Sequence, residues 1–149
     1  TGRPRRCGWF DGVVVSYATR VNWRTSLAVT KLDVLDGCKD IKLCTGYRYN
    51  GRLYKDMSAD LQVLTDCEPV YETFKGWATP TTGLTSYAKL PPQAKRYLAR
   101  IEEVAACPID IISTGSKREE TIVLNNPMAS KRRRPMAKSH SKTAARRAR

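Results

Sequence analysis

Residues that commonly hold metal ions are scarce in this sequence. The only histidine, His140, lies in a strongly basic C-terminal stretch, and no two cysteines form a Cys-x-x-Cys pair. Structural zinc sites need four closely grouped ligands, so we predict no metal site in this chain. We also predict no disulfide framework, because the cysteines are odd in number and widely spaced: Cys7, Cys38, Cys44, Cys67 and Cys107. We expect reduced thiols, as in cytoplasmic proteins.

Long apolar runs are missing as well. No stretch approaches the ~20 apolar residues that a membrane-spanning helix needs, so we predict no contact with a membrane. The chain opens with Thr-Gly-Arg-Pro-Arg-Arg and has neither an initiating methionine nor the apolar centre of a secretory signal. Because this start falls inside a basic motif, we expect the chain to be a piece of a longer cytoplasmic protein.

Positive charge is abundant but unevenly distributed. Residues 125–149 carry nine Lys or Arg and no acidic residue, which leaves four of the thirteen net positive charges for residues 1–124. The hydrophobic content of 41% supports a folded body, whereas no apolar periodicity continues beyond Asn125. We therefore predict one folded domain over residues 1–128 and a disordered basic tail over residues 129–149.

Three helices are expected in the body. Asp11 is a suitable N-cap for a helix through about Asn22, and Ser58 for a short helix through Leu64. The clearest helix begins near Pro92, where apolar residues recur at helical spacing until Pro108 ends the pattern.

Strand patterns alternate with these helices. Asn50-Gly51 is a strong hairpin signal, and residues 76–92 are rich in Thr, Gly and Pro, which predicts a long surface connection. The expected strands are Leu27–Leu32, Ile41–Tyr49, Arg52–Lys55, Val70–Phe74, Ile109–Ile112 and Thr121–Leu124. Helices and strands together predict an α/β fold with a mixed sheet.

The stretch Thr30-Lys31-Leu32-Asp33 follows a short apolar run and is the first candidate site. Ligands of open α/β sheets bind at the carboxyl ends of strands. A carboxylate there can accept hydrogen bonds from both N1–H and the 2-amino group of guanine, while the lysine stem lies along the ring. Adenine offers no such pair of donors. The alternative is an ordinary salt bridge at the end of a strand.

Two further stretches have side chains suited to a ligand. Ser113-Thr114-Gly115 also follows an expected strand, so its backbone amides could reach a carbonyl oxygen of a base, although an ordinary turn has the same pattern. Residues 1–6 place three arginines in a Gly/Pro loop, and guanidinium groups bind carboxylates and phosphates with two hydrogen bonds. A solvated basic loop is the alternative there.

Five blocks of sequence closely resemble the C-terminal third of the adenylosuccinate synthetase family. They occur in the family's order and spacing, and the resemblance runs from Thr1 to about Pro127. The blocks are Thr1-Gly-Arg-Pro-Arg-Arg-Cys-Gly-Trp-Phe-Asp11, Thr30-Lys-Leu-Asp-Val-Leu-Asp-Gly37, Cys67-Glu-Pro-Val-Tyr71, Gly76-Trp77 and Ile109-Asp-Ile-Ile-Ser-Thr-Gly115.

This resemblance implies the C-terminal portion of a P-loop-NTPase-like α/β enzyme that couples GTP hydrolysis to joining IMP and L-aspartate. It implies a cytoplasmic homodimer in AMP biosynthesis. The implied loop for L-aspartate and IMP comprises Thr1, Gly2, Arg3, Pro4 and Arg5, with Arg3 also touching IMP and Arg5 also reaching GTP. The implied guanine contacts are Lys31, Leu32, Asp33, Ser113, Thr114 and Gly115.

Several family features are not in this sequence. The phosphate-binding loop, the catalytic aspartate and histidine, and the Mg²⁺ ligands belong to the family's N-terminal part, so we expect no catalytic residue here and no activity from the chain alone. Ser116-Lys117 stands where the family usually has Pro-Asp. Residues 129–149 match nothing in the family and fit a lineage-specific extension or a read-through without function. The alternative function is a nucleic-acid-associated protein bound through its basic tail.

Overall fold

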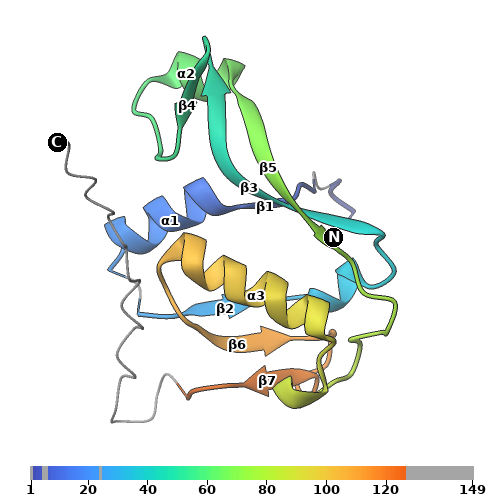
Figure 1. The fold of residues 1–149 in the computed structure, drawn as a ribbon. Coiled ribbons are helices and arrows are strands. Elements are labelled where there is room, and N and C mark those ends of the chain that lie inside the picture. Colours follow the sequence, from blue (N-terminus) through green and yellow to red (C-terminus); the bar gives the residue numbers. More distant parts are fainter. Residues whose placement is uncertain (1, 5–6, 24, 127–149) are drawn as a thin grey trace, which may run out of the picture.

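The computed structural model describes residues 2–4, 7–23 and 25–126, which form two β-sheets with helices packed against them (Figure 1). Within the described residues the element order is β1 (Phe10–Asp11), α1 (Gly12–Val21), β2 (Leu27–Val29), η1 (Leu32–Leu35), β3 (Asp40–Tyr49), β4 (Arg52–Tyr54), α2 (Leu61–Asp66), β5 (Glu68–Lys75), η2 (Tyr87–Lys89), α3 (Pro92–Ala105), β6 (Ile109–Ser113) and β7 (Thr121–Val123). The expected α/β class with mixed sheets is confirmed.

The first sheet is built around the long strand β3. Strand β5 pairs antiparallel with β3 from Asp40 to Arg48, β4 pairs antiparallel with its end, and β1 pairs parallel with its middle. The hairpin between β3 and β4 turns at Asn50 and Gly51, which have φ angles of +47° and +74°. This left-handed pair is the turn that an Asn-Gly sequence predicts.

The second sheet has the order β2-β6-β7, with β2 parallel and β7 antiparallel to β6. Helix α3 lies against both sheets in Figure 1. Its buried face joins residues of both sheets in one core, which comprises Leu32, Ile41, Leu43, Trp77, Leu90, Ala94, Tyr97, Leu98, Ile101, Ile109, Ile112 and Ile122. The helical spacing predicted for α3 is confirmed by this burial.

Three sequence predictions are wrong in detail. The strand expected over Leu27–Leu32 ends at Val29, because Lys31 turns the chain with a left-handed φ of +59° and the 3-10 turn η1 follows. The short second helix is capped by Asp60 instead of Ser58, whose hydroxyl accepts from the Asp60 N–H at 3.1 Å. Residues 76–92 are not simply a surface connection, since Trp77, Thr81 and Leu90 are buried.

Candidate functional site

The candidate site lies where β2 and β6 end. The two strands are parallel, with Val29 opposite Ile112 in the last register pair. Their carboxyl ends therefore lie side by side, and η1 contacts β6 just beyond them. This arrangement brings the two stretches of the predicted guanine site, Lys31–Asp33 and Ser113–Gly115, to one edge of the sheet.

The first stretch forms a tight turn anchored in the core. Leu32 is buried and packs in the main core, whereas Lys31 is exposed. The Val34 N–H donates to the Lys31 carbonyl at 3.3 Å, and the Asp36 N–H donates to the Asp33 carbonyl at 3.0 Å. The backbone of the turn is thus fixed on both sides of Asp33.

Asp33 itself carries the most informative atom of the site. Its Oδ1 is buried and has no hydrogen-bond partner, the only such side-chain atom among the described residues. A buried acceptor without a partner loses its hydration and gains nothing in return, which is costly. Oδ1 of Asp33 is therefore positioned to accept a hydrogen bond from a ligand.

The second stretch presents backbone more than side chains. Thr114 is fully buried, and its hydroxyl donates to the Leu84 carbonyl at 2.8 Å, while the Ser113 hydroxyl donates to the Gly115 carbonyl at 2.8 Å. Both hydroxyls are thus engaged within the chain. A Cβ at position 115 would meet the Glu120 carboxylate, so a side chain there would require Glu120 to move away from the Lys117 N–H.

The divergent pair Ser116-Lys117 sits in a closed turn. The Lys117 N–H donates to the Glu120 Oε2 at 2.9 Å, and the Glu120 N–H donates back to the Lys117 carbonyl at 3.1 Å. The Glu120 carbonyl also accepts from the Thr114 N–H at 2.9 Å. The turn is therefore internally hydrogen-bonded despite the change from the usual Pro-Asp.

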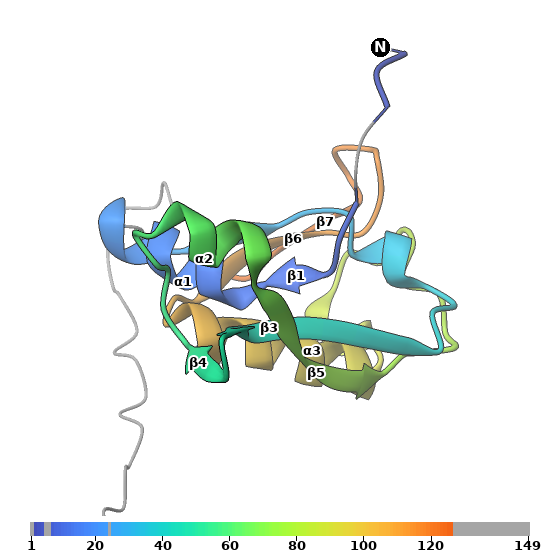
Figure 2. The same ribbon diagram turned by 90° about the horizontal axis from the view of Figure 1, so that it is seen from above.

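The predicted aspartate and IMP loop is only partly within the described residues. Thr1 and Arg5 lie outside them. Gly2, Arg3 and Pro4 are exposed. The described N-terminal segment that contains them lies near the N label in Figure 2. Arg3 forms no ion pair with any described residue, and no hydrogen bond joins these three residues to either strand end among the described residues. The assignment of this loop to L-aspartate, IMP and GTP therefore stays a prediction.

Asp36 is a residue whose importance the sequence analysis missed. Its carboxylate accepts from the Trp77 Nε1–H at 2.6 Å and from the backbone N–H groups of Thr81 and Thr82 at 2.7 and 3.2 Å. In the sequence, Asp36 stood out only as part of the family block that ends at Gly37. The one available signal was Trp77, because a buried indole N–H needs an acceptor.

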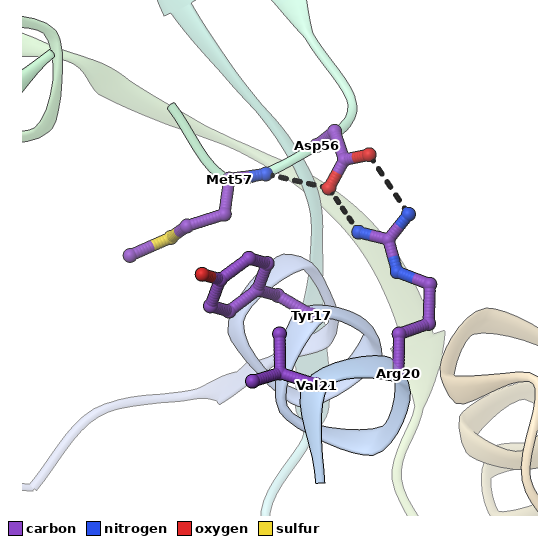
Figure 3. A pocket seen from close by; sticks show the side chains of 5 residues that line it. All are labelled: Tyr17, Arg20, Val21, Asp56 and Met57. Atoms are coloured by element: carbon purple, nitrogen blue, oxygen red, sulfur yellow. Dashed lines mark hydrogen bonds and ion pairs between the residues drawn. The ribbon is translucent and has the colours of Figure 1, made fainter. Parts of the chain in front are cut away.

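A shallow pocket elsewhere on the molecule has a different character (Figure 3). It lies at the C-terminal end of α1 and is lined by Tyr17, Arg20, Val21, Asp56 and Met57. In Figure 1 this end of α1 is on the left, whereas the carboxyl ends of β2 and β6 are on the right. Arg20 and Asp56 form a two-pronged ion pair, which raises the pKa of the guanidinium and lowers the pKa of the carboxyl. Both side chains are more than half exposed, so the pair contributes little to stability.

Two negative findings concern the described residues only. No three His, Cys, Asp or Glu side chains in 2–4, 7–23 and 25–126 lie close enough together to hold a metal ion. In the same ranges, every helix is too short or too polar to cross a bilayer.

These features define the class of the molecule. The parallel pair of β2 and β6, the mixed sheets and the flanking helices belong to the fold of part of a P-loop-NTPase-like α/β enzyme. The family model for adenylosuccinate synthetase matches residues 1–122, and the chain belongs to the adenylosuccinate synthetase family. The family resemblance of the sequence blocks is thereby confirmed.

Individual relatives agree with this assignment. The chain is 53% identical over 127 residues to the adenylosuccinate synthetase of Geotalea uraniireducens (strain Rf4), a match covering 85% of this chain and 30% of the relative. It is 54% identical over 125 residues to that of Carboxydothermus hydrogenoformans, covering 84% of this chain and 29% of the relative. The solved structure of the fully ligated enzyme from Plasmodium falciparum superposes with a TM-score of 0.76 at 35% identity, covering 81% of this chain and 30% of that one. The chain thus spans about 30% of the length of these proteins.

Proposed function

We propose that this chain forms the guanine-recognition and aspartate side of an adenylosuccinate synthetase. The complete protein would be a GTP-dependent C–N ligase that makes adenylosuccinate from IMP and L-aspartate, acting as a cytoplasmic homodimer in AMP biosynthesis. The observation that carries the proposal is the buried, unpartnered Oδ1 of Asp33 at the carboxyl end of β2.

In this proposal the guanine base lies between the two turns. The Asp33 carboxylate accepts from N1–H and from the 2-amino group, and the exposed Lys31 lays its stem along the ring. The hydroxyls of Ser113 and Thr114 are engaged within the chain, and the Thr114 N–H donates to the Glu120 carbonyl. In the proposal the remaining backbone N–H groups of this turn, at Gly115 above all, donate to the 6-carbonyl oxygen. Leu32 does not need to touch the base in this proposal. Its buried side chain anchors the turn that presents Lys31 and Asp33.

The N-terminal loop would supply the contacts to the other two substrates. Thr1, Gly2, Arg3, Pro4 and Arg5 are assigned to L-aspartate, with Arg3 also binding IMP and Arg5 also reaching GTP. Arg3 is exposed and makes no ion pair with a described residue, so its guanidinium is available to an anionic substrate. Mg²⁺ acts with GTP in this family, and its ligands are expected in the family's N-terminal part. The described residues of this chain contain no cluster of side chains that could hold it.

The proposal can be tested by adding the N-terminal part of the relatives that this chain does not span. All 149 residues would be joined behind the N-terminal part of the Geotalea uraniireducens relative to give a protein that we call the completed enzyme. We expect it to form adenylosuccinate from IMP, L-aspartate and GTP in the presence of Mg²⁺. The Geotalea uraniireducens enzyme, assayed in parallel, is the positive control. The proposal is contradicted if the completed enzyme makes no product although it is folded, as shown by cooperative unfolding.

The alternative of a nucleic-acid-associated protein is not supported. The family match covers residues 1–122, and the basic tail on which the alternative depended lies outside the described residues.

A further inference from the structure

The two turns of the candidate site are not bonded to each other directly. Strands β2 and β6 stop pairing at Val29 and Ile112, and among the described residues no hydrogen bond joins residues 30–35 to residues 113–116. The paired strands that lead into the turns and the core shared by Leu32 and Ile112 set part of their relative position. Residues 77–84, far from both turns in the sequence, add hydrogen bonds on each side: to Asp36 just after the first turn and to Thr114 in the second.

The first attachment of residues 77–84 is to Asp36. One carboxylate oxygen, Oδ1, accepts from the Trp77 Nε1–H at 2.6 Å and from the Thr81 hydroxyl at 2.8 Å. The other, Oδ2, accepts from the Thr81 N–H at 2.7 Å and from Thr82 at 3.2 Å (N–H) and 3.3 Å (hydroxyl). Trp77 and Thr81 are buried, so the bonds that they donate are partly shielded from water, whereas the two bonds from Thr82 are exposed.

Asp36 is in turn continuous with the Asp33 turn. Its own N–H donates to the Asp33 carbonyl at 3.0 Å and closes η1. Burial alone would raise the pKa of the Asp36 carboxyl, but the hydrogen bonds from Trp77, Thr81 and Thr82 outweigh it, so the pKa lies below its usual value. The ionised carboxylate is therefore the form that holds this connection.

The second attachment of residues 77–84 is to Thr114. The Gly83 N–H donates to the Thr114 carbonyl at 3.2 Å, and the Thr114 hydroxyl donates to the Leu84 carbonyl at 2.8 Å. Within the segment, the Leu84 N–H donates to the Thr81 carbonyl at 3.1 Å. Gly83 has a left-handed φ of +76°, a conformation that glycine adopts without strain. Thr114 is thus held through both its backbone and its side chain.

We infer that Asp36 is a positioning residue for guanine specificity, and that it acts by holding residues 77–84 as a strut between the Lys31–Asp33 and Ser113–Gly115 turns. This inference rests on the proposed function, in which the two turns contact opposite parts of one base. A base that must meet both turns is bound well only if their separation is fixed. Loosening the strut should therefore weaken GTP selectively, because IMP and L-aspartate are assigned to other residues.

Two substitutions break the strut at its opposite ends. Asp36→Asn leaves one acceptor and turns an amide donor towards the donors of Thr81 and Trp77. Thr114→Val keeps the shape of the side chain but removes the hydrogen bond to Leu84. Tyr47→Phe is the matched control, because it removes a hydrogen bond of 2.6 Å to the Asp11 carboxylate in the other sheet.

The measurements are made on the completed enzyme: kcat, the KM for each substrate, the ratio of kcat/KM for GTP to that for ITP, and the thermal midpoint. ITP lacks the 2-amino group that Asp33 is proposed to read. For Asp36→Asn and Thr114→Val we expect the KM for GTP to rise about tenfold and the preference for GTP over ITP to fall severalfold. The KM values for IMP and L-aspartate should stay within about twofold. Because both substitutions break the same strut, their effects should not add. The KM for GTP of the double variant should equal that of the single variant with the higher KM.

Tyr47→Phe should lower the thermal midpoint and leave the GTP to ITP ratio unchanged. The inference is overturned if the strut variants behave like this control, with a lower thermal midpoint and an unchanged GTP to ITP ratio. It is also overturned if the two substitutions raise the KM for GTP additively. If the Asp36→Asn variant does not fold, the KM for GTP and the GTP to ITP ratio of Thr114→Val alone test the inference. A wild-type completed enzyme that does not use GTP would instead contradict the proposed function, and would remove the basis for the strut with it.

Discussion

At the scale of single residues, the buried and unpartnered Oδ1 of Asp33 lowers the stability of the fold, and a ligand that donates a hydrogen bond to it can restore that stability. An unpartnered buried acceptor destabilises a folded chain by about 1–3 kcal/mol. The turn around Asp33 is held rigidly by backbone hydrogen bonds on either side, so the side chain cannot relieve this cost by a backbone shift alone. A nucleotide base that brings a donor to this atom gains the hydrogen bond without first reorganising the site.

Asp33→Asn in the completed enzyme is the corresponding test. An amide offers one acceptor and one donor, so it cannot accept from both N1–H and the 2-amino group of guanine. Xanthine has a carbonyl oxygen where guanine has the 2-amino group, and should therefore gain from the amide donor. We expect the ratio of kcat/KM for GTP to that for XTP to fall about 100-fold or more, since charge-assisted hydrogen bonds contribute about 1.5–3 kcal/mol each. An unchanged ratio would assign Asp33 a structural role only.

Local patterns could find Asp33 but not the conformation that presents it. Thr30-Lys31-Leu32-Asp33 follows an apolar run, which is enough to place it after a strand. Lys31, however, is left-handed at φ +59°, and nothing in a lysine side chain predicts that. The partners of Asp36 lie more than forty positions away, at Trp77 to Thr82, so they depend on the tertiary fold and have no local signature.

At the scale of elements, the start of α1 is linked to the long strand β3 through one side chain. The Asp11 Oδ1 caps the helix by accepting from the Val13 and Val14 N–H groups at 3.0 and 3.1 Å. Its Oδ2 accepts from the Tyr47 hydroxyl at 2.6 Å. The pKa of Tyr47 is raised, first by burial and then by this carboxylate. One residue thus serves as a helix cap and as the acceptor for a buried phenol.

We expect Asp11→Ala to destabilise the completed enzyme more than Tyr47→Phe does. The alanine variant loses the cap, which is worth about 1 kcal/mol, and also leaves the Tyr47 hydroxyl without its acceptor at about 1–3 kcal/mol. The phenylalanine variant removes the phenol oxygen and keeps the cap. Chemical denaturation of the two variants beside wild type measures the difference. Equal losses would mean that the cap of α1 contributes nothing measurable.

Elements with local signals were predicted well, and those set by tertiary contacts were not. The Asp11 cap, the Asn50-Gly51 hairpin and the apolar face of α3 each depend on residues within a few positions of one another. The burial of Trp77 and Thr81 in a Thr/Gly/Pro-rich stretch depends on contacts with Asp36, more than forty positions away. Composition alone suggested a surface loop there. The cap of α2 was misplaced for a local reason, since Ser58 and Asp60 are both suitable cap residues and only Asp60 accepts from the first turn of the helix.

At the scale of the whole molecule, the charge is divided between a nearly balanced body and the strongly basic residues 129–149. The sequence predicts that this tail contributes nothing to the fold, because it has no apolar periodicity. Deleting residues 129–149 from the completed enzyme should leave its thermal midpoint and its kcat unchanged. A drop of several degrees would imply that the tail docks with on the order of 1 kcal/mol or more.

The chain alone should bind a base and yet do no chemistry. Phosphoryl transfer depends on gripping the β- and γ-phosphates, neutralising their charge with a metal ion and orienting the nucleophile. The described residues have no cluster that could hold a metal, and the chain spans about 30% of its relatives. We therefore expect the purified 149-residue chain to form no adenylosuccinate from IMP, L-aspartate and GTP with Mg²⁺, in an assay where the completed enzyme turns over. A guanine nucleotide should still raise its thermal midpoint more than the matching adenine nucleotide, because the Asp33 contact needs only the base. Turnover by the isolated chain would show that the chemistry resides in residues assigned here to binding.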